Sequence, residues 1–156
     1  MNSTHADRAK ELFMSGYNCS QSVIGAFADE LGLDFETAVK LASPFGAGMG
    51  RMREVCGAVS GMFMVTGLAN GYTDPKEREG KMKLYSDVRS LADEFKSTEG
   101  SIICHELLTG PAAKAGGNPE ERTAQYYKKR PCPEIVYRAA QIAEQYLDSL
   151  KEENKE

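Results

Sequence analysis

The sequence predicts an all-α protein: a single-domain compact helical bundle of about six helices, with a central glycine-containing apolar helix. Two observations predict this fold. Apolar residues recur at helical spacing through most of the chain, and capping residues, glycines or prolines mark the ends of these segments. Only Ser101–Cys104 resembles a strand. The 156 residues favour one domain over residues 1–150, with 151–156 as a frayed C-terminal tail.

Three helices are expected before the middle of the chain. The first covers residues 4–15 and begins at a threonine N-cap. Asn18 and Gln21 have the spacing of a capping box and predict the second. Asp34 caps a short third helix, which ends at Pro44 because the residue before a proline disfavours the helical conformation.

The remaining helices follow the same signals. Glu54–Ala69 is expected to be the central apolar helix. The pairs Asp74-Pro75 and Asn118-Pro119 each predict a helix start, because proline fits the first helical position. Cys132 opens the last helix. The long helix after Pro75 has an expected core stripe of Leu84, Val88, Leu91 and Phe95.

Composition and charge exclude several classes of protein. A net charge of −4 argues against a nucleic-acid binder, which needs a basic face. The first residues lack the apolar core of a secretory signal. The apolar segment Val55–Ala69 has 15 residues, fewer than the roughly 20 that a membrane span needs. We therefore expect a cytoplasmic protein that does not span the membrane, in a compartment that keeps thiols reduced.

The four cysteines are the most informative residues: Cys19, Cys56, Cys104 and Cys132. None forms a CxxC pair, which excludes zinc ribbons, thioredoxin-type dithiols and c-type haem attachment. Cys19 and Cys132 fall where helices begin, and a helix N-terminus stabilises a thiolate. Cys132 also lies between prolines, so we expect it to be the most reactive thiol. The alternative is that all four are buried apolar residues without a chemical role.

Glycines gather in front of the central helix. Gly46, Gly48 and Gly50 form a loop that ends at Arg51, and its N–H groups and arginine are candidates to bind a cofactor. An ordinary turn is the alternative. Gly57, with Gly61 one helical turn later, indicates close approach of either a ligand or another helix.

These motifs together resemble a known family. The runs Phe45–Gly50 and Cys56–Gly61, the stretch Gly16–Gln21 around the first cysteine, and the later Cys104 and Cys132 resemble the bacterial and archaeal redox-active protein family named for its C-GCAxxG-C-C pattern. The resemblance extends over nearly the whole chain. One detail differs: the family label has glycine before cysteine, whereas here Cys56 precedes Gly57.

The resemblance implies a helical protein of this size in which the four cysteines are catalytic thiols or metal ligands. Some members carry selenocysteine, and many are encoded beside transporter genes, which implies redox use and a functional link to a membrane transporter. A similar domain occurs in split-Soret cytochromes, whose cysteines are thought to hold an iron–sulfur centre. This sequence lacks the haem motif, so no haem is expected.

Two functions are carried forward. In the first, the chain is a thiol-based redox or electron-transfer protein whose four cysteines converge, either on an iron–sulfur cluster or zinc or as exchanging dithiols. In the second, it is a non-catalytic binding or assembly module with structural cysteines. The redox partner is not identified by the sequence, and a homodimer is left open.

Overall fold

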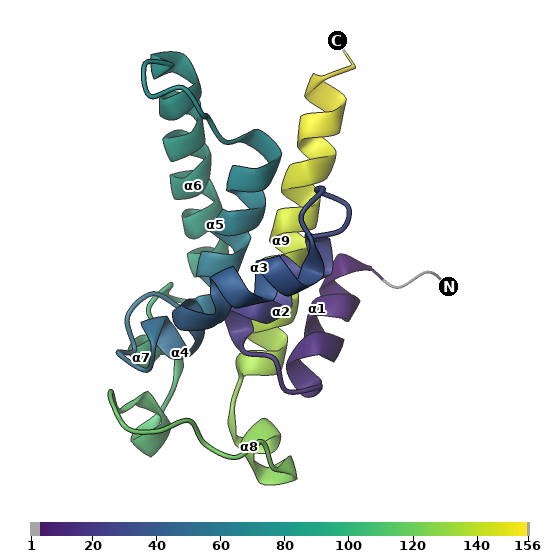
Figure 1. Ribbon diagram of the computed structural model, residues 1–156. Helices are drawn as coiled ribbons and strands as arrows, with labels where there is room; N and C mark the ends of the chain where they lie inside the picture. Colours follow the sequence, from purple (N-terminus) through teal and green to yellow (C-terminus); the bar gives the residue numbers. More distant parts are fainter. Residues whose placement is uncertain (1–3, 156) are drawn as a thin grey trace.

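The computed structural model describes residues 4–155 of the chain, and these form an all-α bundle (Figure 1). Six helices have eight residues or more: α1 (His5–Met14), α2 (Cys19–Phe27), α3 (Phe35–Ala42), α5 (Gly57–Asn70), α6 (Arg78–Glu99) and α9 (Cys132–Glu153). Shorter elements connect them: η1 (Ser43–Phe45), α4 (Gly46–Met49), α7 (Cys104–Leu107), η2 (Gly110–Ala113) and α8 (Ala124–Lys129). The predicted fold class is confirmed. None of the described helices is both long and apolar enough to span a membrane.

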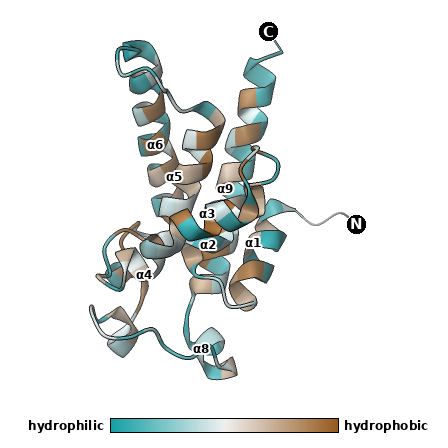
Figure 2. Ribbon diagram, viewed as in Figure 1, coloured by the Kyte–Doolittle hydropathy of each residue, from teal (hydrophilic) through white to brown (hydrophobic). Residues whose placement is uncertain are grey.

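The apolar helix α5 is at the centre of the bundle, as predicted. It packs against α2, α6 and α9, while α1 packs against α2 and α9. Figure 2 shows an α5 ribbon that is mostly brown or pale, whereas teal, hydrophilic residues are frequent on α6. Packing against three neighbours buries the first half of α5 and Val65, whereas Leu68 near its end remains exposed. Removal of this apolar surface from water is the main stabilising term for such a helix.

The predicted caps of the first three helices are present. Thr4 and Asp7 form a capping box at α1, and Asn18 and Gln21 form one at α2. The Asp34 side chain accepts a hydrogen bond from the backbone N–H of Thr37 at the start of α3. Each cap satisfies N–H groups that the helix itself leaves free. The cap at Asn18 matters for function because it fixes the position of Cys19, the first residue of α2.

Three predicted helix starts are too early. The central helix begins at Gly57 rather than Glu54, because Val55 pairs with Ile103 in an isolated antiparallel bridge. Asp74 forms a turn, in which its side chain accepts from a backbone N–H two residues on, and α6 begins only at Arg78. The helix expected from Asn118 begins at Ala124, after a Thr123 cap. In both Asp74-Pro75 and Asn118-Pro119 the proline lies in a connection rather than at the first helical position.

The C-terminal helix extends beyond its expected end. It continues to Glu153, past Lys151 where the frayed tail was expected to begin, and the last residue of that tail, Glu156, lies outside the described residues. The Tyr146 hydroxyl of α9 donates a hydrogen bond of 2.8 Å to Asp87 of α6. This contact joins the two longest helices of the described chain.

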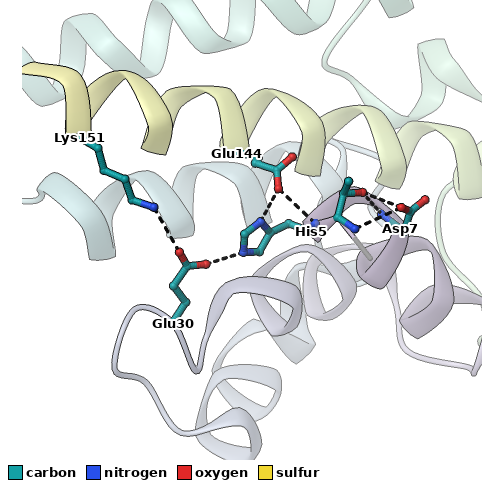
Figure 3. A network of polar contacts seen from close by, with 6 residues as sticks. His5, Asp7, Glu30, Glu144 and Lys151 are labelled. Carbon is teal, nitrogen blue, oxygen red and sulfur yellow. Dashed lines mark hydrogen bonds and ion pairs between the residues drawn. The ribbon is translucent and has the colours of Figure 1, made fainter. Parts of the chain in front are cut away.

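His5 is at the centre of a polar network with Glu30 and Glu144 (Figure 3). Its ring stacks on Phe27 with centroids 4.3 Å apart. One ring nitrogen lies 2.6 Å from a Glu144 carboxylate oxygen, and the other contacts Glu30. Lys151 completes the network by pairing with Glu30 at 3.6 Å. The network joins the start of α1 to α9 and to the turn after α2.

Candidate functional site

All four cysteines line one cavity of about 410 Å³ at the end of the bundle where α9 begins. Figure 1 shows the short elements α4, α7 and α8 gathered there. Each cysteine comes from a helix start: Cys19, Cys104 and Cys132 are the first residues of α2, α7 and α9, and Cys56 is the N-cap of α5. The long helices therefore direct free N–H groups and the positive ends of their dipoles towards the thiols.

A short backbone pairing holds Cys56 and Cys104 at this cavity. The Cys56 N–H donates to the Ile102 carbonyl at 2.8 Å, and the Cys104 N–H donates to the Glu54 carbonyl at 2.6 Å. These two bonds enclose the Val55–Ile103 bridge. The sequence places the segments almost fifty residues apart, so their pairing is what delivers two of the four thiols to one place.

Close packing of α2 on α5 positions Cys19. A Cβ atom built on Gly57 would lie 2.8 Å from the Cys19 sulfur, and one on Gly61 would lie 2.9 Å from the Ser20 carbonyl oxygen. Real Cβ atoms do not approach other atoms so closely, so both glycines are required by packing. Of the two alternatives for these residues, helix contact explains Gly61. Gly57 makes the same kind of contact and also lines the cavity.

The glycine-rich loop folds into a left-handed turn. All residues of 47–51 have φ between 58° and 68°, and Arg53 follows with φ 60°. Such a conformation costs a residue with a side chain roughly 1–2 kcal/mol, and it occurs mostly as single residues. Gly48 is needed twice over, since a Cβ there would also lie 2.6 Å from the Cys104 Cβ. Backbone strain of this kind clusters at functional sites, where the surrounding structure maintains it.

The loop residues named from the sequence divide between the cavity wall and its support. Gly46, Gly50 and Arg51 line the cavity, and the Arg51 side chain donates to the Gly116 carbonyl at 3.0 Å. Gly48 is buried beneath the wall against Cys104. His105 is exposed and is not among the residues that line the cavity.

Besides Arg51, three arginines line the cavity that the sequence analysis did not select: Arg53, Arg122 and Arg130. Arg53 is only 2% exposed, and its Nη1 lies 3.8 Å from the Cys104 sulfur. Arg122 stacks on aromatic rings of the wall, and Arg130 is buried next to Cys132. No periodic pattern marks these residues. The available signal was the position of Arg53 between the glycine loop and Cys56, and of Arg130 two residues before Cys132.

Burial keeps three of the thiols protonated at neutral pH. It raises the pKa of Cys56 well above its ordinary value, and the neighbouring Cys19 raises it further. The same two causes raise the pKa of Cys132 to about 12, against an opposing effect of Arg130. Burial raises the pKa of Cys104, which Arg53 partly offsets. At Cys132 desolvation thus opposes the effect of the helix N-terminus. The expectation that Cys132 is the most reactive thiol stays a prediction, because burial raises the pKa of Cys56 and Cys104 as well.

The thiols are close neighbours without being bonded. None of the four cysteines, all of which are described, forms a disulfide. Within residues 4–155, no group of three or more His, Cys, Asp or Glu side chains is arranged so that it could hold a metal ion. The cavity therefore gathers four thiols without fixing them around a single point.

Comparison with known proteins gives one match. A family described as "Putative redox-active protein (C_GCAxxG_C_C)" matches residues 17–146, which include all four cysteines and the glycine loop. No curated protein matches the chain. No solved structure matches it either.

The family pattern C_GCAxxG_C_C differs from this chain at positions 56 and 57. When GCAxxG is aligned on Ala58 and Gly61, its cysteine falls on Gly57 and its first glycine on Cys56. Glycine and cysteine are thus exchanged here. The pattern would direct a side chain from the first position of α5 at the Cys19 sulfur, whereas this chain has its thiol on the N-cap residue and none in that contact.

Proposed function

Because the chain belongs to this redox-active family, we propose that it transfers electrons through the four cysteines that line the cavity at the start of α9. One observation carries the proposal: four thiols from four separate elements meet at one cavity, in a chain that has no other cysteine. Structural cysteines would need no such convergence. The reducing cytoplasm is the compartment in which such thiols stay available for metal binding or exchange.

An iron–sulfur cluster is the cofactor that this proposal favours. Four cysteine thiolates are the usual ligand set of [2Fe–2S] and [4Fe–4S] clusters. Tetrahedral zinc uses the same set of four thiolates, and the described cysteines are not grouped around either kind of centre. The raised thiol pKa values are consistent with an unmetallated ligand set, in which each thiolate would repel the next. When bound, a cluster would supply one-electron transfer.

The chain's own residues would perform the supporting tasks. Cys19, Cys56, Cys104 and Cys132 would hold the cluster. Free N–H groups at the starts of α2, α5 and α9 would stabilise negative charge on the sulfurs. The wall residues Phe13, Leu107, Leu108 and Ile135 would exclude water. The Arg53 guanidinium would donate to the Cys104 sulfur from within the protein.

Dithiol–disulfide exchange is the second candidate, and the Cys19–Cys56 proximity favours it. After burial, the charge of Cys19 is the next cause that raises the pKa of Cys56, as expected for neighbouring thiols. In this version one thiolate attacks an external disulfide, the mixed disulfide forms, and a second thiol releases the reduced product. Oxidation of the pair would transfer two electrons and two protons to the disulfide substrate.

Anaerobic purification followed by iron and sulfide analysis and a visible spectrum tests the cluster. Stoichiometric iron and sulfide, with charge-transfer absorption that disappears in each Cys→Ser variant, would support it. Protein without metal that loses two free thiols on mild oxidation would support exchange instead. A metal-free chain whose four thiols remain countable after oxidation would refute the proposed redox function. Arg89→Gln, an exposed change on α6, is the control for effects of purification.

A further inference from the structure

Arg53 is a buried positive charge that has no acidic partner within residues 4–155. Its Nε donates to the Lys114 carbonyl at 3.3 Å and its Nη1 lies 3.8 Å from the Cys104 sulfur. Its Nη2 has no hydrogen-bond partner among residues 4–155. A buried charge or N–H group without a partner is costly, so proteins nearly always provide one. The side chain lines the cavity, so a molecule bound there would supply the missing hydrogen-bond partner.

The cavity as a whole is positively charged. Arg51, Arg53, Arg122 and Arg130 line it, and Glu120 is the one acidic lining residue within the described chain. Four positive charges less one leave a formal +3, in a chain whose net charge is −4. Glu120 pairs with Arg130 at 2.5 Å, while Arg51 and Arg122 donate to main-chain carbonyls. The carbonyl contacts do not compensate the positive charges of Arg51 and Arg122.

The Cys104 contact does not occupy the free donor of Arg53. The distance of 3.8 Å joins the Cys104 sulfur to Nη1, and Nη2 remains without a hydrogen-bond partner among the described residues. The one acidic side chain that lines the described cavity, Glu120, is paired with Arg130 instead. A partner for Nη2 would therefore come from something that enters the cavity.

We propose that the cavity binds a small oxyanion, held by the Arg53 guanidinium next to Cys104. A guanidinium offers parallel N–H donors that match the two oxygens of a sulfate-like or carboxylate group. The inference rests on the proposed function in one respect: it names the class of ligand that reaches the redox cysteines. It concerns binding alone and needs no cluster or disulfide.

Calorimetric titration of the reduced full chain tests the proposal, with the protein as purified anaerobically and again after chelation. Sodium sulfate and sodium acetate serve as separate probes at constant ionic strength. We expect saturable binding to one site. Arg53→Gln should weaken it about tenfold or more, the loss expected for a charge-assisted hydrogen bond. Arg89→Gln removes the same charge from exposed α6 and should bind like the wild type.

The two probes distinguish the source of the oxyanion group. Tighter sulfate binding identifies an inorganic oxyanion, tighter acetate binding identifies a carboxylate ligand, and either supports the site. Absence of saturable binding by both probes, or binding unaffected by Arg53→Gln, overturns it. Should that variant not fold, alkylation of wild-type Cys104 provides the readout: sulfate or acetate must slow it relative to chloride. Bound iron or thiol oxidation without anion binding would leave the proposed function standing and refute this inference alone.

Discussion

Replacing Gly61 by alanine tests the contact that positions Cys19. A Cβ at this position would lie 2.8 Å from the Val23 Cβ and 2.9 Å from the Ser20 carbonyl oxygen. Neither atom is the end of a flexible side chain, so the helices must separate. Gly67 is the matched control on the same helix, because a Cβ built there has no atom within 4 Å.

Two opposing terms set the expected size of the effect. Alanine is favoured over glycine in a helix interior by about 1 kcal/mol, which applies to both variants. Overpacking a tight contact costs roughly 1–3 kcal/mol and applies to Gly61→Ala alone. Gly67→Ala should therefore be more stable than wild type by about 1 kcal/mol. Gly61→Ala should be less stable than Gly67→Ala by roughly 1–3 kcal/mol.

Urea or thermal unfolding of the reduced proteins measures this difference. For a chain of this length, each kcal/mol moves the Tm by roughly 2–4 °C. Equal stabilisation of both variants would show that α2 and α5 are not in the close contact described. A destabilised Gly61→Ala should also change the alkylation rate of Cys19, because the same contact fixes the start of α2.

Three further predictions concern groups away from that contact. In the reduced, metal-free chain at pH 7, iodoacetamide should label Cys56 and Cys132 much more slowly than in the unfolded chain, and the rates should rise with pH beyond 9, because the raised pKa values keep both thiols protonated. Tyr146→Phe should cost about 0.5–1.5 kcal/mol in urea unfolding, because it removes the hydrogen bond to Asp87. The raised Tyr146 pKa of about 12 favours the neutral phenol in the folded state, so this contribution is complete below about pH 10 and is lost as the pH rises towards 12. His5→Ala should destabilise the fold by roughly 1–3 kcal/mol, since it leaves two carboxylates without their shared partner.

Controls separate these effects from general damage. Full labelling in urea at pH 7 would confirm that all thiols are reduced, and equally fast labelling of the folded chain would contradict their burial. Tyr137→Phe, on the same helix, is the control for Tyr146→Phe when the free energy of unfolding is measured at alkaline pH. Lys151→Ala removes only an exposed ion pair and should alter the free energy of unfolding by less than about 1 kcal/mol. A His5 variant as stable as this control would mean that the network in Figure 3 contributes little.

Local signals predicted most of the fold because they depend on neighbouring residues. The capping boxes at Thr4 and Asn18 each involve residues three apart, and both are present. The error at the start of the central helix arose where a distant segment competed with a local preference. Glu54 and Val55 are compatible with a helix. They lie extended because the backbone N–H groups of Cys56 and Cys104 each donate to a carbonyl of the opposite segment.

The candidate site could be predicted in its residue types but not in its geometry. Four lone cysteines and the glycine loop were visible in the sequence, and the structure brings them to one cavity. Arg53 was not selected as a binding residue, because its burial depends on the left-handed turn of residues 47–51 and on Lys114, which approaches from a distant connection. The raised pKa of Cys132 was not predicted for a related reason: desolvation is a property of the assembled cavity and cannot be inferred from a helix start.

The exchange of glycine and cysteine at positions 56 and 57 connects the packing to the chemistry. The family pattern has a cysteine at the first residue of α5. Its Cβ would lie 2.8 Å from the Cys19 sulfur, which is close to the Cβ–sulfur distance across an S–S bond of about 2.05 Å. Here that contact is filled by Gly57, and the Cys56 sulfur belongs to the N-cap residue instead. The chain thus keeps the number of thiols and the tight α2–α5 contact while it removes a side-chain pairing at position 57. This arrangement favours joint use of the four thiols around the cavity over a disulfide between α2 and α5. Metal analysis, rather than disulfide mapping, is therefore the first experiment for this protein.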